Sequence, residues 1–365
     1  MGQAIEFLEI LSLSLATIIL MLTVLNHLTI LQPQSGHKAI SRRVVALIPM
    51  RNESRNARGV IDAALSQERL ADFAVQVIDD GSTDGTTEIL REISDPRFSW
   101  QLGGELPVGW LGKNYALHSL AGNSSGDYLV FIDADVRLAR FAIADSIELM
   151  ERRNLDYLCP YPRQIALSTL ERLIQPLLQW SWFASLPLLF AERSLKASTV
   201  VANGQFFIVR ANAYQAIGGH QSIKDEVLDD MELARALRAA GFRGTVVDGS
   251  AIASCRMYES DSELISGYLK SQWRAFGGTS GAVFAILLLS ASSLLPAVLA
   301  LTGSTIGIFC MSALWLSRII VAVRVKSPII SSIFHPIAIG FWIYLIIRSI
   351  AGKRRNQLSW RGRKI

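Results

Sequence analysis

The sequence predicts an α/β domain with a mostly parallel sheet, flanked at both ends of the chain by transmembrane helices. In its middle part, β-branched runs alternate with helix-compatible stretches, and long uncharged apolar runs lie near both ends. Alternation of strand and helix is typical of parallel sheets, whose ligands gather at the carboxyl ends of the strands. Half of the 365 residues are hydrophobic, which is typical of a membrane protein.

The first apolar run covers residues 7–31, where Glu9 is the one acidic residue. A helix needs about 20 such residues to cross a bilayer. We therefore predict an N-terminal transmembrane helix in a segment spanning residues 1–36. A cleaved signal peptide is the alternative, but the leading residues lack a basic region and no small-residue cleavage site follows.

Further apolar runs appear only near the other end, at residues 282–303, 304–323 and 328–347. They predict a transmembrane or re-entrant region over residues 279–350, followed by a basic tail at 351–365. The polar stretch between the two apolar regions predicts a separate soluble domain at residues 37–278.

The net charge of +5 raises the possibility of nucleic-acid binding. However, the basic residues crowd beside the apolar segments, which is typical of cytoplasmic flanks in a membrane protein. These residues are His37, Lys38, Arg42, Arg43, Lys353, Arg354, Arg355, Arg361, Arg363 and Lys364. We therefore expect no nucleic-acid partner, a multi-pass protein of the cell (inner or plasma) membrane, and a soluble domain and tail that both face the cytoplasm.

Three full C-terminal spans would place the basic tail outside, against this charge pattern. We therefore expect one segment to re-enter rather than cross, either the one with Pro296 or the one with Pro336; Arg318 inside an apolar run is a further irregularity. The cysteines Cys159, Cys255 and Cys310 have no CxxC spacing, which favours a reducing compartment over a disulfide framework or a zinc site.

Within the soluble domain, continuous apolar runs predict buried strands at residues 43–50, 73–80 and 127–133, and helices are expected at 55–68 and 83–94. A Leu- and Trp-rich helical segment follows at about 164–193. Its tryptophans favour a helix lying on the membrane interface, with an ordinary core helix as the alternative.

Acidic residues follow each predicted strand. Glu53 comes after the first strand beside Asn52, Asp79 and Asp80 close the second, and Asp133 and Asp135 close the third. Solvated loops would also carry acidic residues, but three clusters at equivalent positions favour one shared site. Carboxylate oxygens in an Asp-x-Asp pair suit Mg²⁺ or Mn²⁺, which use one or two of them together with substrate phosphates.

Taken together, the motifs resemble the family 2 glycosyltransferases of the GT-A fold, a Rossmann-like α/β fold. The resemblance covers residues 43–275, and the motifs LPVGWLGKNYAL (106–117) and Trp360-Arg361-Gly362-Arg363 resemble membrane-bound members such as ceramide glucosyltransferases and bacterial hopanoid- and carotenoid-associated enzymes. The motifs that carry it are IPMRNE (48–53), IDDGSTDG (78–85), WLGKNYAL (110–117), IDAD (132–135), NGQFFIVRANAYQAIGG (203–219) and DDMELARALRAAG (229–241).

The resemblance implies a nucleotide-sugar donor, a UDP- or GDP-sugar, and a metal-dependent reaction. It places Asp79 and Asp80 at the nucleoside and Lys113 near the phosphates. It also implies that the metal lies on Asp135 with Asp133, and that the donor site includes Pro49, Arg51 and Glu53.

The acidic pair Asp229-Asp230 matches the family's catalytic acids, and we expect Asp230 to be the base. Asp229 also stands where aspartate caps a helix. Direct attack by an acceptor hydroxyl inverts the anomeric centre, so this chemistry needs one base and a cation to neutralise the leaving diphosphate. The expected acceptor is a hydroxyl of a membrane lipid-like molecule.

One departure from the family concerns its Q-x-x-R-W run. This chain has Gln272-Trp273-Arg274 in its place, and we expect these residues, with Arg256, to contact the diphosphate or the acceptor. The alternatives are a nucleotidyltransferase, whose glycine- and arginine-rich signature is missing after the first strand, and an inactive membrane partner, which would not need to keep Asp133, Asp135 and Asp230.

Overall fold

The structure is a computed structural model that describes residues 2–36, 38–194, 196–355, 357, 359–360 and 363–364. Its contacts divide the chain into two compact units. The sheet unit contains residues 30–163 and 190–256, and the helical unit contains residues 1–29, 164–189 and 257–365. The predicted residues His37, Arg361 and Gly362 lie outside the described part of the chain.

The sheet unit is built on a central sheet with the strand order β3-β2-β1-β4-β8-β6-β9. A smaller sheet has the order β5-β10-β7. The strands are β1 (Ile40–Met50), β2 (Leu70–Asp79), β3 (Phe98–Leu102), β4 (Tyr128–Ile132), β5 (Val136–Leu138), β6 (Tyr157–Tyr161), β7 (Arg163–Gln164), β8 (Phe206–Arg210), β9 (Gly244–Asp248) and β10 (Ala253–Cys255). The helices are α2 (Ala57–Leu65), α3 (Thr86–Arg91), α4 (Gly112–Gly122), α5 (Ala142–Arg153), α8 (Ala211–Ala216) and α9 (Asp229–Ala239), with 3₁₀ turns η1 (Ala197–Thr199) and η2 (Gly219–Ile223).

The predicted α/β class with a mostly parallel sheet is confirmed. Strands β3, β2, β1 and β4 run parallel to one another, and β8 pairs antiparallel with β4 and β6. The three strands expected from the sequence lie in β1, β2 and β4, because their continuous apolar runs bury both faces between helices. Residues 44–48 and 128–132 are almost fully enclosed and form the core of the sheet.

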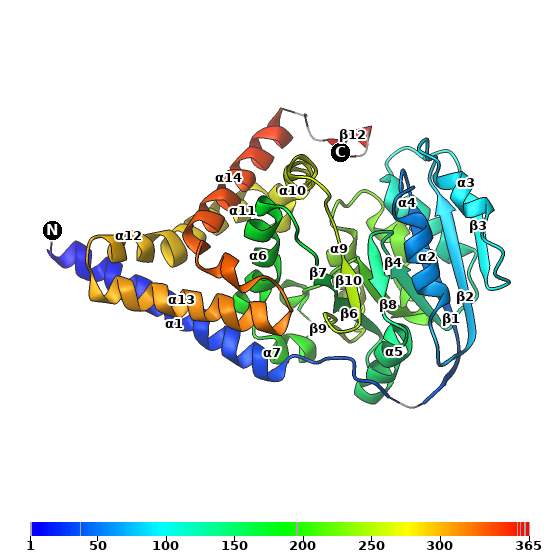
Figure 1. Ribbon diagram of the computed structural model, residues 1–365, viewed down its shortest axis with the longest axis horizontal. Helices are drawn as coiled ribbons and strands as arrows, with labels where there is room; N and C mark the ends of the chain where they lie inside the picture. The colour runs from blue at the N-terminus through cyan, green and yellow to red at the C-terminus, as the bar shows by residue number, and fades with distance from the viewer. Residues whose placement is uncertain are drawn as a thin grey trace. The chain divides into compact units, whose positions relative to one another are not determined.

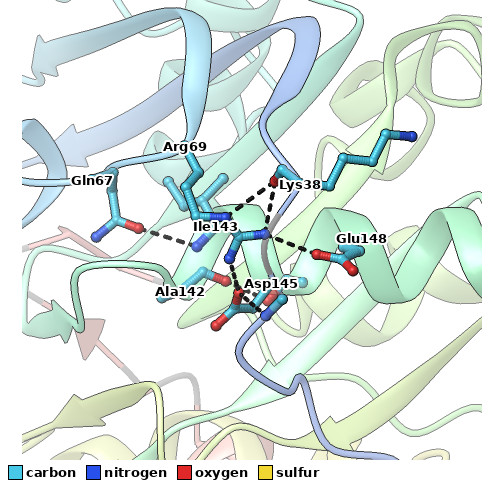
Figure 2. A network of polar contacts seen from close by, with 9 residues as sticks. Lys38, Gln67, Arg69, Ala142, Ile143, Asp145 and Glu148 are labelled. Atoms are coloured by element: carbon cyan, nitrogen blue, oxygen red, sulfur yellow. Dashed lines mark hydrogen bonds and ion pairs between the residues drawn. The ribbon is translucent and has the colours of Figure 1, made fainter.

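A polar network fastens the chain that precedes β1 to α5 (Figure 2). Arg69 donates to the carboxylates of Asp145 at 2.5 Å and Glu148 at 2.8 Å, and also to the backbone carbonyl of Lys38. The backbone amide of Gly36 donates to the same Asp145 carboxylate at 3.3 Å. Because Arg69 and Asp145 are mostly buried, solvent screens these ion pairs little. The network therefore holds the segment before β1 firmly against α5.

The helical unit contains α1 (Gly2–Thr29), α6 (Thr169–Ser185), α10 (Asp261–Ala275), α11 (Thr279–Leu289), α12 (Leu295–Leu301), α13 (Thr305–Arg324) and α14 (His335–Arg354). A π-helical turn, η3 (Ser290–Leu294), joins α11 to α12, and a 3₁₀ turn, η4 (Ile329–Ser332), precedes α14. Helix α7 (Leu188–Arg193) falls at the boundary of the two units, and a short ribbon pairs β11 (Ser359–Trp360) with β12 (Arg363–Lys364).

Among the described residues, four helical segments have the length and apolar composition to cross a membrane: Gly2–Thr29, Thr279–Leu301, Thr305–Arg324 and His335–Arg354. They match the predicted apolar segments at both ends of the chain. Helices α1 and α13 run side by side along most of their length (Figure 1). Their contact is apolar around Ala16 and Cys310, and it includes a hydrogen bond between Thr23 and Ser317.

Helix α6, in the segment predicted to lie on the membrane interface, packs against α1, α13 and α14. It begins at a capping box in which Ser168 accepts from the backbone of Glu171 and the Glu171 carboxylate accepts from the backbone of Ser168. The rings of Trp180 and Trp182 are both buried. Asn26 of α1 binds the end of this helix through the carbonyls of Phe183 and Leu186, so α6 is an integral part of the helical unit.

Candidate active site

The carboxyl ends of β1, β2 and β4 meet at one edge of the central sheet. The register pairs Met50 with Asp79 at the ends of β1 and β2, and Leu47 with Phe131 near the end of β4. The predicted acidic residues follow these strands directly, so the sheet brings the three clusters to the same edge. This edge belongs entirely to the sheet unit.

The turn after β2 is held by Asp79. Its buried carboxylate accepts from the backbone amide of Ser82 at 2.9 Å and from the hydroxyl of Thr87. The guanidinium of Arg51 donates to the backbone carbonyl of Asp80 at 2.6 Å and lies 3.9 Å from its carboxylate. Asp79 therefore shapes the turn, and Arg51 and Asp80 face each other across the gap between the first two strands.

The loop after β1 is tied to the same turn. Asn52 adopts a left-handed conformation with φ of 54°, and its side-chain oxygen accepts from the backbone amide of Thr83 at 2.8 Å. The backbone amide of Asn52 donates to the hydroxyl of Ser82, and the backbone amide of Glu53 donates to the hydroxyl of Thr86. These bonds fix residues 52 and 53 against the IDDGSTDG turn (78–85), whose Asp79 and Asp80 the family resemblance places at the nucleoside.

Lys113 bridges the two acidic pairs: Asp133 belongs to the pair predicted to bind the metal, and Asp229 belongs to the pair predicted to be catalytic. It stands in the first turn of α4, and its Nζ lies 2.8 Å from Asp133 and 3.2 Å from Asp229. These two carboxylates raise the pKa of Lys113 even though desolvation of the ammonium opposes the shift. Its side chain keeps 36% of its exposure, so part of it faces solvent.

Asp230 is held by two backbone amides. One carboxylate oxygen accepts from Gly204 at 2.8 Å and the other accepts from Met231 at 2.7 Å. Desolvation of this part-buried carboxyl and the neighbouring charge of Asp229 raise its pKa to about 6, although Lys113 and both amides favour the charged form. A carboxylate with this pKa accepts a proton more readily than an ordinary aspartate, and it is still mostly ionised at pH 7.

Gly204 makes this arrangement possible because its backbone approaches both charged groups. A Cβ added there would lie 3.2 Å from the Cβ of Asp230 and 3.5 Å from the Nζ of Lys113. The neighbouring Gln205 carbonyl accepts from the backbone amide of Asp133 at 3.1 Å. The loop before β8 thus contacts both acidic pairs, the one after β4 and the one that opens α9.

The surroundings of the Asp135 carboxylate suit a divalent cation. Its Oδ1 is enclosed and has no hydrogen-bond partner among the described residues, and the thiol of Cys255 donates to the carboxylate. Desolvation, with the carboxylates of Asp133 and Glu53, raises the pKa of Asp135 to about 7. An anionic oxygen that faces other anionic oxygens and lacks a donor is the setting that Mg²⁺ and Mn²⁺ prefer.

The carboxylates supply only part of a coordination shell. In the part of the chain that the structure describes, no group of three His, Cys, Asp or Glu side chains is arranged to hold a metal ion. Two carboxylates with further oxygens from a diphosphate satisfy the way these cations are commonly bound.

Four other predicted residues belong to regular elements rather than to these loops. Pro49 lies within β1, where it pairs with Ile78. Gln272, Trp273 and Arg274 belong to α10 in the helical unit, where Gln272 accepts from the indole of Trp342 at 2.8 Å. Their predicted contact with the diphosphate or the acceptor stays a prediction.

Sequence reasoning missed three supporting residues. Gly204 holds Asp230, Cys255 contacts Asp135, and Asn114 donates to the carbonyls of Ile223, Lys224 and Glu226, which fastens the loop before α9. The signal for Gly204 was available, because it lies in the NGQFF motif already singled out. Asn114 likewise lies in the WLGKNYAL motif already singled out. Cys255 lies far from Asp135 along the chain and carries no local signal.

Comparison with known proteins identifies a family model that covers much of the sheet unit and residues 164–189 of the helical unit. Residues 45–218 match the model described as Glycosyl transferase family 2. The chain is 26% identical over 239 residues to a 4,4'-diaponeurosporenoate glycosyltransferase of Staphylococcus haemolyticus (strain JCSC1435); the match covers 63% of this chain and 61% of that protein, less than two thirds of its length. A protein of the same description from Staphylococcus aureus (strain USA300) is 22% identical over 352 residues, which cover 90% of this chain and 88% of that protein.

A solved structure extends the likeness to nearly the whole fold. It is the mannosyltransferase PcManGT from Pyrobaculum calidifontis in complex with GDP-Man and Mn²⁺. The TM-score is 0.56 at 15% sequence identity, and the alignment covers 96% of this chain and 98% of that one. At this identity, the likeness establishes a shared GT-A fold.

Proposed function

We propose how this chain, a glycosyltransferase whose residues 45–218 form a family 2 domain, carries out its reaction. It moves a sugar from a UDP- or GDP-sugar to a hydroxyl of a lipid-like acceptor in the membrane, with inversion of the anomeric centre. The single observation that carries the proposal is the position of Lys113. Its ammonium pairs with both Asp133 and Asp229, beside the Asp230 carboxylate that accepts from the Gly204 amide. A phosphate-binding cation and a candidate base are thereby held within one small cluster.

The donor end of the site is formed by the loops after β1 and β2. In the proposal, Asp80, Arg51 and Glu53 bind the nucleoside and its first phosphate, while Asp79 keeps the turn in shape. Asp133 and Asp135 would hold Mg²⁺ or Mn²⁺, which neutralises the negative charge that grows on the leaving diphosphate. The solved relative with this fold is described with GDP-Man and Mn²⁺, which supports the kind of donor and cation.

Lys113 serves the same leaving group from the protein side. Its ammonium is shared by two carboxylates and stays protonated, so it can donate to a phosphate oxygen without losing its charge. Asp229 holds the ammonium in place. The part that Asp229 plays is therefore positioning, since its carboxylate is already engaged by Lys113.

Asp230 takes the proton from the acceptor hydroxyl. Each carboxylate oxygen accepts one hydrogen bond from a backbone amide and can accept another from the hydroxyl of the acceptor. With a pKa of about 6, the group is ionised at neutral pH and still basic enough to remove the proton as the bond to the sugar forms. A positioned base of this kind contributes about 10²–10⁴-fold to the rate.

The acceptor enters from the membrane in this proposal. The curated relatives are named for 4,4'-diaponeurosporenoate, a carotenoid, and the apolar helices of this chain suit an acceptor that is held in a bilayer. Mass spectrometry of lipids from cells with and without the gene tests this directly. A hexose-bearing lipid that disappears with the gene and returns with the wild-type chain is expected, and an unchanged glycolipid profile would refute the proposal.

Contacts within the helical unit support a membrane arrangement with three crossings. Helix α14 is bonded to α10: Trp342 donates to Gln272, and nearer the C-terminal end of α14 the hydroxyl of Ser349 donates to the carbonyl of Leu269 while accepting from the amide of Trp273. Helix α10 immediately precedes α11 in the chain. The end of α14 is therefore fastened to the side of the membrane from which α11 enters.

The crossings in this arrangement are α1, the continuous α11–α12 segment and α13, and α14 re-enters from the cytoplasmic side without crossing. This chooses the Pro336-containing segment of the two that the sequence left open. It also leaves Arg324, Lys326, Lys353 and Arg354 on the cytoplasmic side, as the charge pattern requires.

Cysteine labelling tests the arrangement. A cysteine at Gln357, in an otherwise cysteine-free active chain, should resist an impermeant thiol reagent in intact cells and react after the membrane is permeabilised. A cysteine at Thr302, in the turn between α12 and α13, should react in intact cells. Labelling at residue 357 without permeabilisation would show that α14 crosses.

A further inference from the structure

Arg318 is buried inside the helical unit and has no counter-ion among the described residues. It lies on α13, where 2% of its surface is exposed, and neither terminal nitrogen of its guanidinium has a hydrogen-bond partner among the described residues. The acidic side chains of this unit with described contacts are engaged elsewhere. Glu9 accepts from Ser304, and Asp261 accepts from Ser168. Glu171 accepts from the amides of Leu167 and Ser168, and Glu263 accepts from the amide of Glu259.

The surroundings of Arg318 are built to hold it. The guanidinium carbon lies 5.8 Å from the centre of the Trp180 ring, and the indole of Trp180 donates to the hydroxyl of Ser317 at 2.9 Å. Ser317 in turn bonds Thr23 of α1 at 2.8 Å, so three helices fix the ring that lies against Arg318. A ring face stabilises a cation but offers no hydrogen-bond acceptor in the plane of the guanidinium.

His335 forms the other wall of this cluster. It opens α14, is fully buried, and has no partner on either ring nitrogen in the described part of the chain. Its ring lies 4.9 Å from that of Trp180 at an angle of 72°, and it is within electrostatic range of Arg318. Three residues earlier, the hydroxyl of Ser332 is also buried without a partner. Several polar groups in one region therefore lack the partner that burial demands.

We infer that this cluster is a binding site for the oxyanion of an anionic lipid, a carboxylate or a phosphate. A planar guanidinium whose two terminal nitrogens have no partner in the described chain matches the paired oxygens of such a group, and a histidine N–H supplies a further donor. An isolated buried charge is costly, and an anion that enters from the bilayer removes that cost.

The depth and surface of the cluster suit a lipid. Arg318 lies six residues before Arg324, the end of α13, which is about 9 Å at 1.5 Å per residue. This is a depth that a headgroup or a terminal carboxylate can reach in a membrane. Beside His335, the side chains of Ile333, Phe334 and Ile337 are exposed and can pack against the lipid's apolar chain.

Lipid binding to the purified full chain tests the inference. The protein in neutral detergent is titrated with dioleoylphosphatidylglycerol, oleate or dioleoylphosphatidylcholine, and retained lipid is measured by native mass spectrometry. We expect the wild type to retain at least one of the two anionic lipids in preference to phosphatidylcholine. Arg318→Met, which is close in length but uncharged, should bind that lipid about tenfold more weakly or worse.

Matched variants separate lipid binding at Arg318 from a general effect of positive charge. Arg348→Met removes an exposed arginine that contacts Tyr344 on α14, and its lipid binding should equal that of the wild type. Arg318→Lys keeps the charge without the planar fork and should recover only part of the affinity. Because Arg318→Met removes an uncompensated charge, its melting temperature in neutral detergent should be at or above that of the wild type.

Each outcome has a meaning. Retention of phosphatidylglycerol alone identifies a bilayer phospholipid as the source of the oxyanion, and retention of oleate alone identifies a carboxylate lipid; either supports the site. Equal retention of anionic and neutral lipid by the wild type, or undiminished binding by a folded Arg318→Met chain, would overturn it. These measurements use no sugar donor, so they do not depend on the proposed transfer reaction.

Discussion

Replacing Asp230 with asparagine removes the proposed base while changing the side chain's shape little. The carboxylate accepts from two backbone amides, and an asparagine can accept from only one of them, because its amide nitrogen would face the other N–H group. Loss of a positioned base costs about 10²–10⁴-fold in rate, which corresponds to about 2.7–5.4 kcal/mol of transition-state stabilisation. We therefore expect the turnover of Asp230→Asn to fall by two decades or more.

Donor affinity should separate this effect from a collapsed site. The described hydrogen bonds of Asp230 go to Gly204 and Met231 and not to the donor loops, so the Kd for the nucleotide sugar should stay within about threefold of the wild type. Calorimetry gives the Kd, and lipid-extractable radiolabel gives the turnover. Asp72→Asn, an exposed residue paired with Arg43, is the matched control. Normal turnover in Asp230→Asn would refute the assignment of the base.

Further predictions concern the same cluster. Asp135→Asn should abolish Mn²⁺-dependent transfer and weaken metal-dependent donor binding measured by calorimetry; ordinary turnover with unchanged metal dependence would contradict the cation site. Gly204→Ala should lower kcat about tenfold, because its new Cβ displaces Asp230 by a few tenths of an ångström, whereas Gly122→Ala has open space and should behave as the wild type. The pKa of Asp230 is raised to about 6, so turnover should fall as the pH drops through that value. Asp229→Asn removes the negative charge that raises this pKa, so its remaining activity should show an acid limb at lower pH than the wild type, and a limb at the same pH would count against the coupling.

Much of the sheet unit could be predicted from the sequence because its strands are buried on both faces. Residues 44–50 and 128–132 are continuous apolar runs, and that pattern indicates central parallel strands. The acidic residues at the strand ends were also predictable, since parallel strands bring their carboxyl ends to one edge. What the sequence could not give is the distance between clusters, such as the contact of Lys113 with both Asp133 and Asp229.

The packing of the helical unit could not be predicted from the sequence. Length and apolar composition reveal candidate spans but not which helix faces which, because lipid-facing and buried positions are both apolar. The bonds from α14 to α10 join residues about 70–80 positions apart and have no local pattern. The same holds for Arg318, which stood out in the sequence as an irregularity, while its contacts with Trp180 on α6 and its nearness to His335 on α14 emerge only from the packing.

The most direct measurement of the central claim is transfer by the purified chain. The protein in detergent is incubated with radiolabelled UDP- or GDP-sugars, Mn²⁺ and a lipid extract from its own cells, and the organic phase is analysed. The account predicts that label from one donor enters a lipid fraction in proportion to enzyme, and that Asp230→Asn and omission of the cation each remove this signal. Label that stays entirely in the aqueous phase with every donor, or that enters lipid equally with Asp230→Asn, would contradict it.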